Sequence, residues 1–92
     1  MPNIIVELPA ALQPLAGGVN EITLNGEKVG DILKALMASH QAVGQRVLSR
    51  GGELRAHVHV FVDEEDVRHL DGLDTAIDGY RRMVIVPSVA GG

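Results

Sequence analysis

One amphipathic helix constrains what this chain can fold into. Five apolar residues recur at intervals of three and four positions, which places them along one face of a helix. They are Val29, Ile32, Leu33, Leu36 and Met37. Asp31 lies in the predicted first turn, where a carboxylate interacts favourably with the helix dipole, although Lys28 before it is not a favoured N-cap residue. A single helix of this kind covers only one face of one sheet.

Two short segments before this helix have the composition of β-strands. Residues 3–8 form a β-branched run that ends at Pro9. Residues 19–24 alternate, so Ile22 and Leu24 share one face, and the Asn25-Gly26 pair after them favours a turn. The two segments predict a hairpin with a loop between them.

The segments after the helix predict the rest of the sheet. Residues 41–48 predict a further helical turn, and residues 57–62 alternate strictly, as a half-buried strand does. An acidic turn at residues 63–66 leads to a short predicted strand at residues 67–68, and a last strand covers residues 83–86. This order predicts an α+β roll, in which one main helix packs across a mixed sheet of four to five strands.

Composition excludes several classes of function. The chain has 92 residues, eight Lys and Arg against twelve Asp and Glu, and a formal net charge of −4. The sequence contains no cluster of cations, so we expect no nucleic-acid partner and favour a basic protein partner. The absence of Cys removes disulfides, thiolate metal ligands and nucleophilic thiols. A chain this short leaves little room for a deep substrate cavity, so we do not expect an enzyme acting alone.

The sequence shows neither a targeting signal nor a membrane span. No stretch approaches the ~20 apolar residues that a transmembrane helix needs. Residues 1–3 open neither a basic nor an apolar leader segment. We therefore expect no membrane contact and a cytoplasmic location.

Two glycines end the sequence after Pro87. Gly91 and Gly92 have no side chains, so such a tail can thread a narrow channel and present its carboxylate to another protein's catalytic centre. Residues 87–92 reach about 20 Å when extended. We expect a folded domain at residues 1–86 and a flexible tail at residues 87–92. The alternative is a terminus without a role.

Three segments carry a resemblance to a known family. They are residues 58–68 (VHVFVDEEDVR), 72–77 (GLDTAI) and 85–92 (IVPSVAGG). They resemble the ubiquitin-like sulfur carriers, the small β-grasp proteins of thiamine and molybdopterin synthesis and their relatives. Within that group they look most like the branch that serves cysteine synthesis. The resemblance implies a β-grasp fold, whose element order agrees with the order predicted above.

The resemblance also implies a chemistry for the tail. In such carriers an E1-like, ATP-dependent adenylyltransferase activates the terminal carboxylate, here that of Gly92, and a sulfur donor converts it to a thiocarboxylate. Gly91, Ala90 and Val89 match the residues that thread the partner's active site. The carrier is then a co-substrate that has no catalytic residue and binds no cofactor itself.

The branch that serves cysteine synthesis implies further partners. One is a sulfur-accepting synthase that holds pyridoxal phosphate and forms a thioester with the carrier. An acyl shift and release by a metalloprotease follow. ATP is used by the activating partner, and pyridoxal phosphate belongs to the synthase.

Alternation predicts a docking patch on the outer face of the sheet. Phe61 and His59 lie opposite the apolar face of their strand, and Val84 and Val86 lie outward on the last strand if Met83 faces the helix. Clustered apolar side chains on a surface often mark an interface. The alternative is scattered surface apolarity, which is common.

Two charged features have simpler interpretations beside functional ones. The chain departs from the family at residues 78–82 (DGYRR), where the family commonly has an acidic turn, and Arg81 and Arg82 there are equally consistent with a solvated loop. His57 and His59 have a spacing that metals can use, with His69 or Asp63 as further ligands. We favour a partly exposed face for the two histidines and expect no metal.

Three other functions fit the same tail. The chain could be the small subunit of molybdopterin synthase, or a ubiquitin-like modifier that Gly92 joins to a lysine of another protein. It could also be a β-grasp interaction module whose tail is inert.

Overall fold

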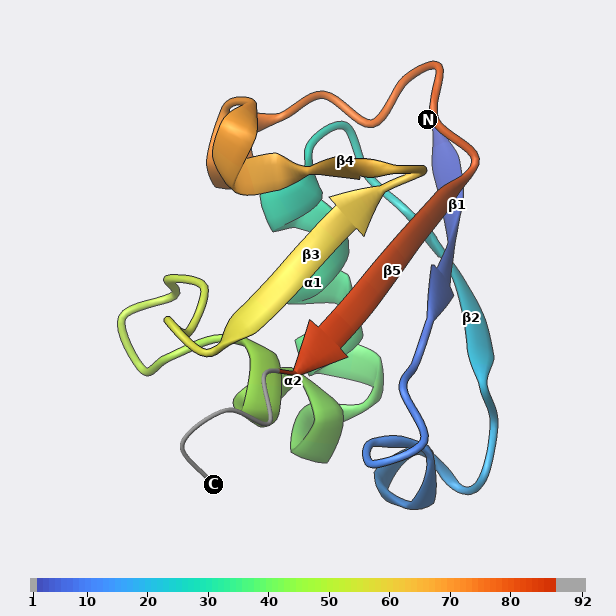
Figure 1. Ribbon diagram of the computed structural model, residues 1–92. Helices are drawn as coiled ribbons and strands as arrows, with labels where there is room; N and C mark the ends of the chain where they lie inside the picture. Colours follow the sequence, from blue (N-terminus) through green and yellow to red (C-terminus); the bar gives the residue numbers. More distant parts are fainter. Residues whose placement is uncertain (1, 88–92) are drawn as a thin grey trace.

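The computed structural model describes residues 2–87, and its strands and helices follow one another in a β-grasp order (Figure 1). The strands are β1 (Asn3–Glu7), β2 (Glu21–Asn25), β3 (Val58–Val62), β4 (Glu65–Asp66) and β5 (Arg82–Pro87). The α-helices are α1 (Val29–Ser39) and α2 (Gln41–Val47). Three short 3₁₀ helices are η1 (Gln13–Ala16), η2 (Val67–His69) and η3 (Gly72–Asp74).

All five strands form one mixed sheet in the order β2-β1-β5-β3-β4. The central strand, β5, pairs in parallel with β1, and every other neighbouring pair is antiparallel. Helix α1 crosses one face of the sheet, and α2 follows it at the end of the sheet where β5 ends (Figure 1). This architecture confirms the predicted α+β roll with a mixed sheet.

The core lies between α1 and the sheet face that it covers. The stripe on α1 is confirmed, because Val29, Ile32, Leu33 and Leu36 are fully buried, with Met37 at its margin. Alternating residues of the strands face these side chains, as the period of two predicts. They are Ile4, Val6, Val58, Val60, Val62, Met83 and Ile85.

Hydrogen bonds to its own Asp31 and to one distant segment fix the start of helix α1. The carboxylate of Asp31 accepts hydrogen bonds from the backbone N–H groups of Glu27 and Lys28, each at 3.2 Å. The backbone N–H of Val29 donates to the carbonyl oxygen of Thr75 at 2.9 Å. Asp31 therefore compensates for the weak N-cap through direct hydrogen bonds as well as through the helix dipole.

A glycine allows α2 to pack closely against α1. His40 leaves the helical conformation between the two helices, with φ −138° and ψ 73°. A Cβ atom on Gly44 would lie 2.6 Å from the Cα atom of Met37, closer than real contacts allow. The further helical turn predicted after α1 is confirmed as a separate helix, and Val43 and Val47 of this helix are buried.

Two predicted elements differ from the structure. The strand predicted at residues 67–68 is wrong, because the strand is Glu65–Asp66 and residues 67–69 form the 3₁₀ helix η2. The shift follows from a tight turn in which Asp63 adopts a positive φ of 56°, so β4 pairs with β3 at once. The loop after β1 contains the 3₁₀ helix η1, whose Ala16 is buried.

Candidate functional site

The tail prediction concerns residues that the structure does not describe. Val89, Ala90, Gly91 and Gly92 lie outside the described residues, so their predicted roles remain predictions. The described chain reaches Pro87, the last residue of β5. Pro87 pairs with Val58, the first residue of β3, at one end of the sheet. Pro87 therefore lies at the end of the sheet where α2 lies (Figure 1).

The four predicted docking residues lie together on the sheet face opposite α1. His59 is the cross-strand partner of Val86, and Phe61 is the partner of Val84. Directly paired residues have side chains on the same face, so the four form one contiguous patch, which we call the apolar patch. Val86 is 40% exposed, and the other three are half-buried by their neighbours. The face assignment is confirmed, and the docking role stays a prediction.

An ionic cluster borders the apolar patch on the side of β1 and β2. The Arg82 guanidinium lies 3.1 Å from a carboxylate oxygen of Glu7 and 2.7 Å from one of Glu21. The hydrogen bond to Glu21, together with the charge of both carboxylates, raises the pKa of Arg82. The interpretation of the arginine pair as a solvated loop therefore holds for Arg81, which is exposed, but is wrong for Arg82.

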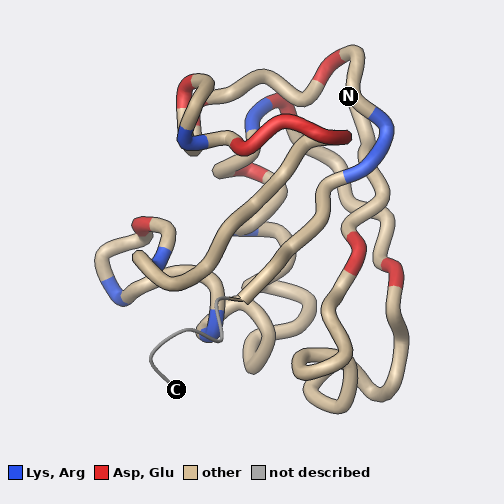
Figure 2. Tube along the Cα trace, in the orientation of Figure 1, with Lys and Arg blue, Asp and Glu red and all other residues tan. Residues whose placement is uncertain are grey.

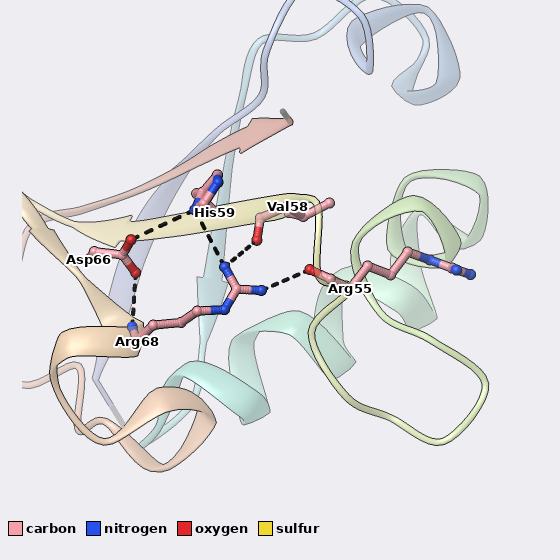
Figure 3. Close-up of polar contacts among 5 residues, drawn as sticks. All are labelled: Arg55, Val58, His59, Asp66 and Arg68. Carbon is pink, nitrogen blue, oxygen red and sulfur yellow. Dashed lines mark hydrogen bonds and ion pairs between the residues drawn. The ribbon is translucent and has the colours of Figure 1, made fainter. Parts of the chain in front are cut away.

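A second polar cluster borders the patch on the side of β4 (Figure 3). The guanidinium of Arg68 donates to the carbonyl oxygens of Val58 at 2.7 Å and Arg55 at 2.8 Å. It also lies 3.4 Å from Nδ1 of His59, which is 3.7 Å from a carboxylate oxygen of Asp66. Because β4 pairs only with the last two residues of β3, Arg68 occupies the edge that no strand covers.

The acidic turn between β3 and β4 organises the start of β5. One carboxylate oxygen of Asp63 accepts hydrogen bonds from the backbone N–H groups of Arg81 at 3.1 Å and Arg82 at 3.0 Å. The hydroxyl of Tyr80 donates to Glu65 at 2.7 Å, and this bond raises the pKa of Tyr80. Sequence analysis identified this run only as an acidic turn and missed both contacts, which join residues at least 15 positions apart.

Neither a metal centre nor a membrane span is visible in the described part of the chain. Within residues 2–87, no three His, Cys, Asp or Glu side chains gather as they would around a metal ion. His59 contacts Arg68 and Asp66 instead. Over the same residues, neither helix combines the length and the apolar character that crossing a lipid bilayer requires.

A five-stranded mixed sheet crossed on one face by a single long helix defines a β-grasp, ubiquitin-like protein. Comparison with known proteins specifies the family. Residues 6–92 match the ThiS family. The chain therefore belongs to the ThiS family, which confirms the resemblance to the ubiquitin-like sulfur carriers.

Three relatives show how far the similarity extends. The sulfur carrier protein CysO of Mycobacterium tuberculosis is 35% identical over 92 residues, which cover 98% of this chain and 99% of that protein. The solution structure of small archaeal modifier protein 1 from Methanosarcina acetivorans has a TM-score of 0.88 and 32% identity, and the match covers 100% of this chain and 98% of that one. CysO in the crystal structure of the Amycolatopsis orientalis BexX/CysO complex has a TM-score of 0.85 and 30% identity, and the match covers 97% of this chain and 99% of that one.

Proposed function

We propose that this chain is a sulfur carrier whose Gly92 carboxylate becomes a thiocarboxylate. The observation that carries the proposal is the ThiS family match, which extends to residue 92 and therefore includes both terminal glycines. The full-length similarity to a protein named as a sulfur carrier supports it. Under this proposal Gly92 is a reacting group of a co-substrate, and the catalytic groups belong to partner enzymes.

The chemistry requires activation because a carboxylate is a poor acyl donor. An oxygen of the Gly92 carboxylate attacks the α-phosphorus of ATP, and pyrophosphate leaves. Hydrosulfide from a donor then attacks the acyl carbon of the adenylate. AMP leaves with one of the former carboxylate oxygens, a proton is released, and the thiocarboxylate remains. No oxidation or reduction occurs in either step.

The apolar patch supplies the docking surface in this proposal. An adenylyltransferase that receives the tail contacts the folded domain around Pro87, and the patch residue His59 directly follows Val58, the partner of Pro87. Val86, its most exposed aliphatic member, immediately precedes Pro87. Docking there buries apolar surface while the tail enters the enzyme. A sulfur-accepting synthase uses the same face in turn, so one carrier binds one partner at a time.

We further propose that the acceptor serves cysteine synthesis. The support is the similarity to CysO, including the CysO chain that forms a complex with BexX. The acceptor would be an amino-acid substrate held by a pyridoxal-phosphate synthase. The sulfur of the Gly92 thiocarboxylate would bond to a side-chain carbon of that substrate as a leaving group departs from the same carbon, which gives a thioester between Gly92 and the new amino acid. An acyl shift would then place the new amino acid in amide linkage, from which a metalloprotease releases it.

Intact-protein mass spectrometry tests the proposal. The chain is incubated with ATP, the E1-like adenylyltransferase of the same organism and sulfide. Replacement of one oxygen by sulfur adds about 16 Da, and we expect this gain on the full chain only. The matched control is a chain that lacks Gly92. Methionine oxidation adds nearly the same mass, so the gain is counted only where it depends on ATP. An ATP-dependent gain on the control, or none on the full chain, would refute the assignment of Gly92.

A protein modifier is the second candidate function. The observation that favours it is the TM-score of 0.88 with small archaeal modifier protein 1 over the whole chain. The same adenylate would then react with a lysine amine of another protein, with AMP as the leaving group, to form an isopeptide bond. Trypsin cleaves after Arg82, so a conjugate would leave residues 83–92 (MVIVPSVAGG) on the lysine of the other protein. Tryptic peptides that carry this ten-residue branch, found only when Gly92 is present, would support this function.

A further inference from the structure

Positive charge is concentrated in one segment of an otherwise acidic chain. Residues 35–62 contain three arginines and only one acidic residue, Glu53. The rest of the chain holds five Lys and Arg against eleven Asp and Glu. The three arginines, at positions 46, 50 and 55, are too far apart in sequence to count as a cluster. Composition alone therefore did not reveal this concentration of positive charge.

The fold brings these arginines to one place. An open hollow of about 360 Å³ is lined by Gln45, Arg46, Arg55 and His57. Gln45 and Arg55 also line an adjoining hollow of about 310 Å³, together with Arg50. We call Arg46, Arg50, Arg55 and His57 the basic surface. It is formed by α2, the connection from α2 to β3, and the residue before β3.

Backbone contacts hold the basic surface in shape. The side-chain Nε–H of Arg55 donates to the carbonyl oxygen of Gln45 at 2.9 Å. The backbone N–H of Arg55 donates to the carbonyl oxygen of Val47 at 3.0 Å. Arg68 fixes the carbonyl of Arg55, as described above. Among residues 2–87, by contrast, no hydrogen bond or ion pair engages the side chains of Arg46 and Arg50, which leaves their charges available to another molecule.

The basic surface adjoins Pro87, the last residue that the structure describes. His57 immediately precedes Val58, and Val58 pairs with Pro87. Figure 2 shows the arginines of α2 and of its connection to β3 at the end of the molecule where β5 ends, with the acidic β3–β4 turn at the opposite end. The molecule is therefore polarised along the sheet, with its positive end where β5 ends.

We propose that the basic surface docks against carboxylates at the rim of the channel through which the adenylyltransferase receives the tail. This inference rests on the proposed function, because any enzyme that acts on Gly92 must approach the chain at this end. Arginines complement carboxylates in charge and in hydrogen-bonding geometry. The acidic opposite end is repelled by the same rim, so the charge distribution orients the carrier tail-first during encounter.

Charge reversal tests the proposal. The variant Arg46→Glu/Arg50→Glu changes two side chains that make no described contact. The control Lys34→Glu/Arg81→Glu imposes the same change of net charge on two exposed residues, one on α1 and one at the opposite end of β5. Calorimetric titration with the adenylyltransferase of the same organism measures the affinity at low and at high salt. We expect the first variant to bind about tenfold more weakly at low salt, with a smaller difference at high salt, and the control to bind within about threefold of the unmodified chain.

Two further measurements separate the possible failures. If the unmodified chain gains no sulfur in the mass assay, the proposed function fails and this inference fails with it. If the chain gains sulfur but the Arg46→Glu/Arg50→Glu variant binds as tightly as the control, only the basic surface is refuted. Should a melting curve show that the variant is unfolded, Arg46→Gln/Arg50→Gln removes the charges without reversal and must still lose affinity relative to Lys34→Gln/Arg81→Gln.

Discussion

Tyr80 is the only tyrosine of a chain without tryptophan, and it reports directly on one contact of the site. Its hydrogen bond to Glu65 raises its pKa, so we expect alkaline titration by ultraviolet difference spectroscopy to give a midpoint above the ordinary value of about 10. Because folding raises the pKa of Tyr80, its hydrogen bond to Glu65 stabilises the fold fully when the pH is below the pKa of Tyr80 in the unfolded chain. This stabilisation is lost as the pH rises through the pKa of Tyr80 in the folded chain. Glu65→Ala should return the midpoint toward 10, and an identical midpoint in both proteins would show that the contact does not form in solution.

A substitution of Phe61 tests whether this residue serves partner binding or the stability of the fold. Phe61→Ser should weaken binding to the adenylyltransferase or synthase by about 2 kcal/mol if it lies at the centre of the interface. Because Phe61 is half-buried against Val84, we expect the free energy of unfolding to fall by up to about 1 kcal/mol, a larger cost than a fully exposed residue would give. Unchanged affinity together with a large loss of stability would show that Phe61 serves the fold alone.

Two valines of similar exposure provide a matched comparison for the apolar patch. Val86, within the patch, is 40% exposed, and Val19, before β2, is 43% exposed. Val86→Ser should weaken partner binding, whereas Val19→Ser should leave the affinity unchanged. Equal effects on affinity from the two substitutions would mean that general surface apolarity, and not this patch, governs binding.

At the scale of elements, α1 contributes four fully buried side chains to the core. Leu36 on this helix is fully buried, so Leu36→Ala should reduce the free energy of unfolding by about 2–5 kcal/mol. Lys34 lies on the exposed face of the same helix, and Lys34→Ala should change stability by less than about 0.5 kcal/mol. Denaturant midpoints of the two variants give the comparison. A loss below about 1 kcal/mol for Leu36→Ala would contradict the packing described here.

The side chain of Arg68 binds the backbone of β3 at Val58, beyond the two residues of β3 that pair with β4. Arg68→Lys keeps the charge but removes the planar fork that binds the carbonyls of Val58 and Arg55. We expect a loss of stability of about 1 kcal/mol and faster hydrogen exchange in the segment between α2 and β3. Exchange at β1 and β2, on the far side of the sheet, serves as the internal reference and should not accelerate selectively.

For the whole molecule, periodicity accounts for what could be predicted from sequence. The α1 stripe and the alternation of β3 identified both buried faces, and the outward placement of Phe61 and His59 followed from them. Contacts between distant segments had no local signal. The bond from Arg82 to Glu21 spans 61 positions and exists because β1 pairs with β5 on one side and with β2 on the other. The position of β4 depends on a positive φ at Asp63, which a run of acidic residues does not reveal.

The central claim is that a folded β-grasp domain presents Gly92 as a sulfur-bearing group. The most direct test is the intact mass of the chain isolated under anaerobic conditions from cells of its own organism. The account predicts a fraction of the chain heavier by about 16 Da, with the sulfur located on Gly92 by fragmentation. A chain recovered only as isopeptide conjugates on lysines of other proteins, or only with an unmodified carboxylate while sulfur is actively assimilated, would contradict it.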